Sequence, residues 1–431
     1  MAEQTRAGSR ATRTRSTART ATEGAPTPRR RPKNRKAQIA AVAAEAFSER
    51  GYHSVGIDEI AAAVGISGPA LYRHFPNKYA LFRDAALSLG TTLGTAVAEA
   101  DAACASIADP AERLDRLLLA AIRTTVECRR TAGLYRWESR YLTAEDRDAV
   151  RREIWGVNRR IGAALAALRP ELPEPDNVIL SAAMLSVVGS ITAHRAPLAN
   201  RRIERLLLEA CRSVARVRPA TTGWSHDEPP RAPGLAVANK REVLLHEAIL
   251  LFYARGYHDV SIEEIGAAAG INASGVYRHF ASKADLLAAA FHRAADRLAV
   301  AVNGTLADST TPAEALRSLT RVYVQLSFAR SELMVVYFTE IGNLPDSHRT
   351  DLRNIQRLNV EEWARLLGEV RPDLSAVECR FLVHAALNLV LDVGRLLHFD
   401  ATPANETRVQ QLMLATLLGD TALLADPAAD A

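Results

Sequence analysis

The stretch "GYHSVGIDEIAAAVGISGPALYRHFPNKYALF", residues 51–82, decides the fold, because residues 256–287 repeat it as "GYHDVSIEEIGAAAGINASGVYRHFASKADLL". The two segments are identical at 17 of 32 positions without a gap. Their offset of 205 residues becomes 202 further along the chain, where Glu138 aligns with Glu340 and Arg147 with Arg349. A unit of about 200 residues therefore occurs twice, which is too long a period for a solenoid and indicates two fused domains of one ancestry.

Each segment has the order of helix, turn and helix that a helix-turn-helix motif requires. Gly51 and Gly256 follow an amphipathic helix, at a place where only glycine enters the left-handed conformation at little cost. The runs 65–67 (Gly-Ile-Ser) and 270–272 (Gly-Ile-Asn) then predict a tight turn and a residue suited to cap the next helix. We expect that third helix over 68–75 and 273–280, followed by new helices that begin at Lys78 and Lys283.

The start of the second helix differs between the copies. Ser261 and Glu264 have the spacing of a capping box, whereas Gly56 occupies the capping position of the first copy. The first copy should therefore begin this helix less firmly, by roughly a few tenths of a kcal/mol.

The motif order Gly-Tyr, Ile-x-Glu-Ile, Gly-Ile, Tyr-x-His-Phe and Lys resembles the DNA-binding domain of the TetR family of bacterial transcription regulators. The resemblance is specific over residues 36–84 and 241–289, and over the remaining helical regions it is one of layout only. It implies that the third helix reads the major groove, while the motif tyrosine and lysine hold the DNA backbone. The DNA-contacting residues so implied are Ser67, Gly68, Pro69, Ala70, Tyr72, Arg73, His74 and Lys78, and Asn272, Ala273, Ser274, Gly275, Tyr277, Arg278, His279 and Lys283. Leu71, Phe75, Val276 and Phe280 should point inward as core residues.

Composition favours an all-α protein, because 48% of the 431 residues are hydrophobic and only 6% are aromatic, with alanine and leucine prominent. Residues 1–36 hold eleven Lys or Arg against two Glu, which is typical of a disordered basic arm, although such a terminus could also be an organellar transit peptide. We expect the following domains: arm 1–32, helix-turn-helix domain 33–87, helical ligand-binding and dimerisation domain 88–217, linker 218–238, helix-turn-helix domain 239–292, and helical ligand-binding and dimerisation domain 293–431.

The helical domains offer one candidate effector site in each copy. Polar groups gather among aromatic side chains at Tyr135, Trp137 and Glu138, and again at Tyr337, Phe338 and Glu340. The alternative is ordinary core with a satisfied carboxylate. The four cysteines show no metal-ligand spacing, so no metal and no cofactor are expected.

The resemblance implies a sequence-specific regulator, more a repressor than an activator, that responds to an unknown small-molecule effector and binds double-stranded operator DNA. One chain carries both reading helices, which predicts an intramolecular pseudo-dimer on two unequal half-sites; a homodimer with four helix-turn-helix domains is the alternative. The competing classes are an architectural protein that binds DNA non-specifically through the basic arm, and an enzyme, for which no catalytic motif is present. No run approaches the length of a membrane span, so we expect a cytoplasmic, nucleoid-associated bacterial protein.

Overall fold

The computed structural model describes residues 35–131, 134, 141–219 and 238–419. Every regular element in these ranges is a helix, as the composition predicts. The basic arm, most of the linker at 218–238, and Tyr135, Trp137 and Glu138 lie outside the described residues.

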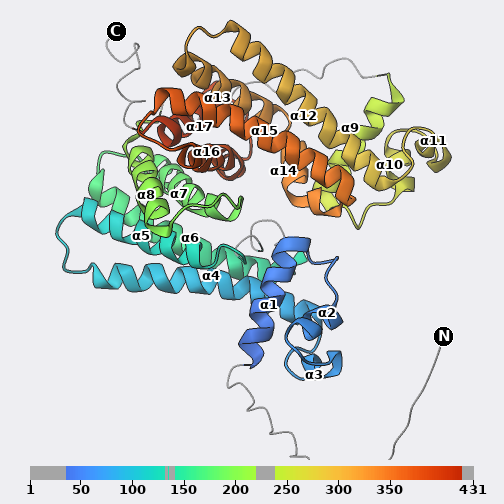
Figure 1. Ribbon diagram of the computed structural model, residues 1–431, viewed down its shortest axis with the longest axis horizontal. Coiled ribbons are helices and arrows are strands. Elements are labelled where there is room, and N and C mark those ends of the chain that lie inside the picture. Colours follow the sequence, from blue (N-terminus) through green and yellow to red (C-terminus); the bar gives the residue numbers. More distant parts are fainter. Residues whose placement is uncertain (1–34, 132–133, 135–140, 220–237, 420–431) are drawn as a thin grey trace, which may run out of the picture.

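The first copy, residues 35–217, begins with a helix-turn-helix module and continues as a bundle of longer helices (Figure 1). Its module contains α1 (Arg35–Arg50), α2 (Ile57–Ala63) and α3 (Gly68–Tyr72). Its helical body contains α4 (Lys78–Ala103), α5 (Pro110–Glu127), α6 (Ala144–Leu168), α7 (Glu174–Gly189), the 3-10 helix η3 (Ser190–Thr192) and α8 (Asn200–Arg216).

The second copy, residues 239–419, repeats this order. Its module contains α9 (Lys240–Arg255), α10 (Ile262–Ala268) and α11 (Ala273–Tyr277). Its body contains α12 (Lys283–Asp308), α13 (Pro312–Ala329), α14 (Ser331–Glu340), the 3-10 helix η4 (Ile341–Asn343), α15 (Asp346–Val370), α16 (Ala376–Leu396) and α17 (Pro403–Leu418).

Local chemistry explains where the module helices begin and end. Gly51 and Gly256 have φ of 81° and 86°, and Gly65 and Gly270 have φ of 69° and 68°, so both turns use the left-handed region that favours glycine. The predicted capping box at Ser261 is present, and the position of Gly56 has no side-chain cap. The predicted capping box is therefore confirmed.

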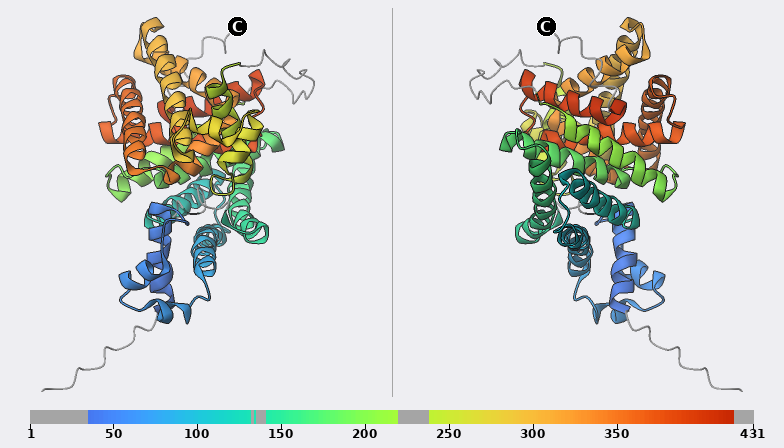
Figure 2. Two further views of the ribbon diagram at one scale, coloured as in Figure 1. Left: turned by 90° about the vertical axis from the view of Figure 1, so that its right-hand side faces the viewer. Right: turned by 90° about the vertical axis from the view of Figure 1, so that its left-hand side faces the viewer.

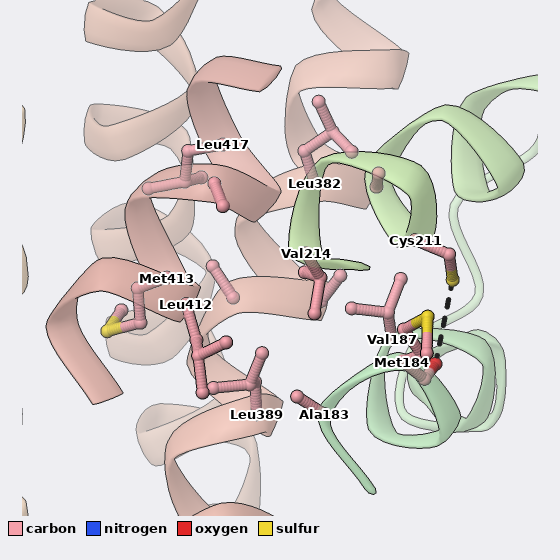
Figure 3. Packing of buried hydrophobic residues seen from close by; sticks show 14 of the residues in the cluster. Ala183, Met184, Val187, Cys211, Val214, Leu382, Leu389, Leu412, Met413 and Leu417 are labelled. Atoms are coloured by element: carbon pink, nitrogen blue, oxygen red, sulfur yellow. Dashed lines mark hydrogen bonds between the residues drawn. The ribbon is translucent and has the colours of Figure 1, made fainter. Parts of the chain in front are cut away.

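Three hydrophobic cores hold the chain together. One lies inside each helix-turn-helix module and the first helices of its body, and a third joins the two bodies into a single interior. This shared core is built on α7 and α8 of the first copy packed against α16 and α17 of the second. Figure 3 shows Val187 and Val214 on one side facing Leu382, Leu389 and Leu412 on the other.

Polar contacts across the shared core join unlike side chains. The hydroxyl of Ser186 donates to the carboxylate of Asp392 at 2.6 Å, and Arg202 donates to the buried Glu378 at 2.9 Å. Arg408 of the second copy lies 3.6 Å from Asp176, which aligns with Glu378 in the repeat. The two bodies therefore associate much as two subunits would, but within one chain.

The most apolar helical stretch belongs to this core. Residues Glu174–Thr192 are long and apolar enough by composition to cross a membrane, and 67% of that window is buried inside the protein. Burial of this kind is what a core helix at the contact between the two bodies requires.

Candidate nucleic-acid interface

The two helix-turn-helix modules each expose one short helix to solvent. In Figure 1 α3 lies at the lower edge of the molecule and α11 at its right-hand edge. Figure 2 shows the first module standing out below the rest of the chain. The modules approach each other at the loops before α2 and α10, where the ring centroids of His53 and His258 lie 4.1 Å apart. These histidines occupy equivalent positions of the repeat.

The third helix of each module is shorter than the sequence predicts. It ends at Tyr72 and Tyr277 rather than at Phe75 and Phe280. The amide of His74 donates to the carbonyl of Leu71, three residues back, so the chain tightens and leaves the α-helical path. The inward residues are nevertheless correctly predicted, because Leu71, Phe75, Val276 and Phe280 are all buried.

Most of the implied contact residues lie on the solvent side. Tyr72 and Tyr277 are 50% and 54% exposed, although large aromatic side chains are mostly buried. The other exposed members of the set are Ser67, Pro69, Arg73, His74, Asn272, Ser274, Arg278 and His279, and the half-buried members are Ala70, Ala273 and Gly275. Each module thus presents a tyrosine, an arginine and a histidine on one surface.

The expectation that Gly68 faces the bases is wrong. It is buried at the start of α3, and a Cβ atom added there would collide with the carboxylate of Asp58. Ser67 also makes no side-chain cap to α3, whereas Asn272 accepts from the amide of Gly275 at 2.8 Å. The second reading helix is therefore the better capped of the two.

Lys78 and Lys283 serve first to hold their own modules. The ammonium of Lys283 donates to the carbonyls of Tyr257 and Val260, both at 2.7 Å, and lies 4.3 Å from the centroid of the Tyr257 ring. Lys78 donates to the carbonyl of His53 at 3.3 Å. Burial lowers the pKa of both lysines below its usual value. Lys283 retains one N–H for a phosphate, because an ammonium group has three donors.

The first residues of α1 and α9 are basic in both copies, and the sequence argument did not single them out. Arg35 donates to the carbonyl of Val64 at 3.1 Å, and the equivalent Lys240 donates to that of Ala269 at 3.0 Å. The next residue, Lys36 or Arg241, lies over the ring of the buried phenylalanine that follows the reading helix. The recurrence of two basic residues at an offset of 205 was the signal that could have identified them.

Glu340 and Tyr337 join the second module to its body. Glu340 is 0% exposed, and its carboxylate accepts from the amide of Tyr257 at 2.9 Å and from the side-chain amide of Asn343 at 2.5 Å. The ring of Tyr337 lies 5.0 Å from that of Phe291 and 5.5 Å from that of Phe338, and burial raises the pKa of Tyr337 to about 12. This is the satisfied carboxylate of ordinary core rather than a group that orients an effector.

A small cavity lies instead in the body of the first copy, between α4, α5, α6 and α7. It has a volume of about 30 Å³, which holds about one water molecule. Its lining includes Gly90, Thr124, Thr125, Cys128 and Gly189. Among the residues that the structure describes, no group of three or more His, Cys, Asp or Glu side chains could hold a metal ion.

Two solvent-exposed reading helices, each fixed by a glycine turn on a buried core, define a helix-turn-helix DNA-binding protein. Residues 39–85 and 244–290 match the family described as bacterial regulatory proteins, tetR family. The DNA-binding unit of that family therefore occurs twice in the chain. Both matched regions are of the kind found in DNA-binding transcription regulators.

Two relatives from Mycolicibacterium smegmatis match stretches of different length. The HTH-type transcriptional activator FasR is 48% identical over 48 residues, which is 11% of this chain and 22% of FasR. The HTH-type transcriptional repressor KstR2 is 27% identical over 191 residues, which is 42% of this chain and 90% of KstR2. A crystal structure of a TetR-family transcriptional regulator from Bordetella parapertussis 12822 is 23% identical, covers 44% of this chain and 100% of its own, and has a TM-score of 0.37.

Proposed function

We propose that the protein is a sequence-specific, ligand-responsive transcription repressor in which one chain reads two unequal DNA half-sites. The observation that carries this proposal is the contact between the two bodies. Ser186 with Asp392 and Arg202 with Glu378 pair unlike residues of the two copies across one apolar core. The single chain thereby supplies both modules and the interface that determines the distance between them.

The two modules would prefer different DNA sequences. Their reading helices carry Gly-Pro-Ala-Leu-Tyr in α3 and Ala-Ser-Gly-Val-Tyr in α11, while Arg73 and Arg278 occupy the same position in both. An arginine that reaches guanine gives about 1–3 kcal/mol of discrimination. The short side chains around it leave the remaining specificity to backbone fit and DNA shape.

A repressor is favoured because KstR2, whose name states that function, matches most of its own length, whereas FasR, named an activator, matches over 48 residues only. The effector site would be the cavity in the first copy, where small residues line α4, α5 and α7. At about 30 Å³ this cavity must widen to admit a ligand. Widening would shift the body helices and, through them, the spacing of the two modules, which must match about one turn of DNA, 34–36 Å.

Within the bacterial cytoplasm the protein would reside on the nucleoid, and the basic arm at 1–32 would add affinity for all DNA. Deleting residues 1–30 should then weaken binding to specific and non-specific duplexes alike. A loss confined to the specific site would contradict that role for the arm.

The test is to select binding sites from a random DNA library and to measure the mass of the protein free and on the selected DNA. One chain on one asymmetric pair of half-sites supports the proposal. If two chains bind a palindrome or four half-sites, the protein binds DNA as a homodimer rather than as a single chain. If no sequence is selected and binding collapses with salt, the protein is an architectural DNA-binding protein instead.

A further inference from the structure

An open cleft of about 830 Å³ lies between the two copies, beside the contact of the two modules. Its walls come from the first module and α6 on one side, and from α9, α14 and α16 on the other. This volume falls within the range of about 300–1,000 Å³ that is usual for small-molecule sites. The cleft adjoins the small cavity of the first body, because Ile154 lines both.

The cleft presents aromatic rings from both copies. Trp155 of α6 is 53% exposed and Tyr253 of α9 is 51% exposed, and both line the cleft. Tyr52 and Tyr141 lie deeper, with ring centroids 5.8 Å apart. Half-exposed rings on opposite walls offer flat apolar faces to a planar ligand.

Positive charge accompanies the rings. Arg147, Arg151 and Trp155 recur every four residues and so share one face of α6. Arg255 and Arg395 line the other side, and the carboxylates of the lining are those of Asp259 and Asp392.

Several of these charges already have partners. Asp392 accepts from Ser186 at 2.6 Å, and Arg255 pairs with Glu264 at 2.7 Å. Arg151 pairs with Asp148 at 3.3 Å, but both side chains are exposed, and such surface pairs are worth at most about 1 kcal/mol. An anionic ligand can therefore compete for Arg151.

The repeat itself does not account for the two exposed rings. Trp155 aligns with Arg357 in the second copy, and Tyr253 aligns with Ser48 in the first. No residue of α15, the counterpart of α6, is among the described residues that line the cleft. The aromatic walls are thus particular to the way in which the two copies face each other.

We propose that this cleft binds a small molecule that combines a flat aromatic ring with an anionic group. Such a ligand stacks on Trp155 and Tyr253 while its anion meets Arg151. Because His53 and His258 belong to the same lining, the ligand contacts both modules at once and favours one spacing between them. This site goes beyond the proposed effector cavity, which lies inside one body.

The probe is 1-anilinonaphthalene-8-sulfonate, a fluorescent aromatic sulfonate, titrated into the full chain without DNA. We expect saturable binding at one dominant site. Trp155→Ala and Arg151→Ala should each weaken it by about fivefold or more, as stacking and charge-assisted contacts of about 1 kcal/mol require. Tyr253→Ala on the opposite wall should weaken binding by a similar factor. Because Tyr253 lies on α9, this variant shows whether the loss of binding comes only from a disturbance of α6.

The matched controls are Arg353→Ala, which is the repeat counterpart of Arg151 on α15, and Leu358→Ala, which removes another exposed apolar side chain. Both should bind the probe as the unchanged chain does. The inference is overturned if all five variants bind alike, or if inorganic phosphate displaces the probe as well as benzoate does. Displacement by a short non-operator duplex would also overturn it, by assigning the cleft to the DNA surface. None of these results depends on operator binding, which is measured separately.

Discussion

The two helix-turn-helix modules share the same order of helices and the same glycine turns, whereas the bodies behind them fill their interiors differently. In the first body, Thr124 and Gly189 line a cavity; their counterparts in the second are Leu326 and Leu391. There, the ring of Phe399 packs against Gly394, 5.6 Å from Phe328, and Tyr323 lies 6.0 Å from the buried Trp363.

This difference shows which part of the repeated unit is constrained by its function. A module must keep one surface for DNA on a small core, so the repeat retains 17 of 32 residues there. A body needs only to bury its helices, which many combinations of side chains achieve. The first body has small residues around a space, and two of the equivalent positions in the second body are leucines.

The largest expected effect comes from breaking the contact between the bodies. Ser186→Asp places a second carboxylate beside Asp392 in a buried site, and an uncompensated buried charge costs about 3–5 kcal/mol. We expect a lower Tm and loss of operator binding, measured by calorimetry and by gel shift. Ser186→Ala, the control, removes one hydrogen bond and should cost about 1 kcal/mol. An unchanged Tm in Ser186→Asp would show that the bodies do not depend on this contact.

Acid should loosen the same contact through two histidines that lack counterparts in the repeat. His194 and His384 stack with ring centroids 4.3 Å apart, and burial together with nearby positive charge lowers the pKa of His194 to about 2. Burial is also the main cause that lowers the pKa of His384 to about 4. In the unfolded chain these histidines bind protons near pH 6.5, whereas in the folded chain they stay neutral until a lower pH. The free energy of unfolding therefore decreases as the pH falls. Between pH 7 and pH 5 we expect a loss of about 2 kcal/mol per histidine.

Urea unfolding across this pH range measures the effect. His384→Leu should flatten the pH dependence, because one of the two buried groups is gone. His74→Ala, which removes an exposed histidine from the first module, should leave the slope as it is. Equal slopes in all three proteins would refute the assignment.

A substitution in one module should impair DNA binding by that module and leave DNA binding by the other unchanged. Arg73→Ala should weaken binding by about 1–3 kcal/mol and relax preference in one half-site, and Arg278→Ala should do the same in the other. Site selection with each variant identifies the half-site that each module reads. If either variant relaxes both halves, then the two modules do not divide the operator between them.

The smallest effect concerns the start of the second module helix. Ser261→Ala removes a complete capping box and should cost about 1 kcal/mol. Gly56→Ser supplies the missing cap, and open space surrounds the added Cβ, so we expect a gain of a few tenths of a kcal/mol. Thermal unfolding of the two variants should shift in opposite directions; shifts of the same sign would show that capping does not limit either module.

The modules could be predicted from sequence because their signals are local. Gly65 and Gly270 fix the turns, and the buried Phe75 and Phe280 follow from the motif. The fold class followed from composition. The early end of the reading helix was missed, since the amides of His74 and Phe75 both donate to the carbonyl of Leu71 and no residue type in the motif signals this turn.

The interior could not be predicted in the same way. Whether the body holds a cavity depends on side chains far apart in sequence, such as Phe399 against Phe328. The role of Glu340 depends on the amide of Tyr257, which lies 83 residues away. The aromatic residues around Glu340 therefore suggested a pocket in the sequence, whereas in the structure they pack where the second module meets its body.

The unlike pairs between the bodies also bear on gene dosage. Both sides of the contact are encoded in one polypeptide, so its formation is intramolecular and independent of protein concentration. A regulator assembled from two separate chains falls apart on dilution, and its active fraction changes with expression level. A chain that carries its own partner keeps this contact at a few copies per cell. In the proposed single-chain reader, the occupancy of DNA would then rise in simple proportion to the abundance of the protein.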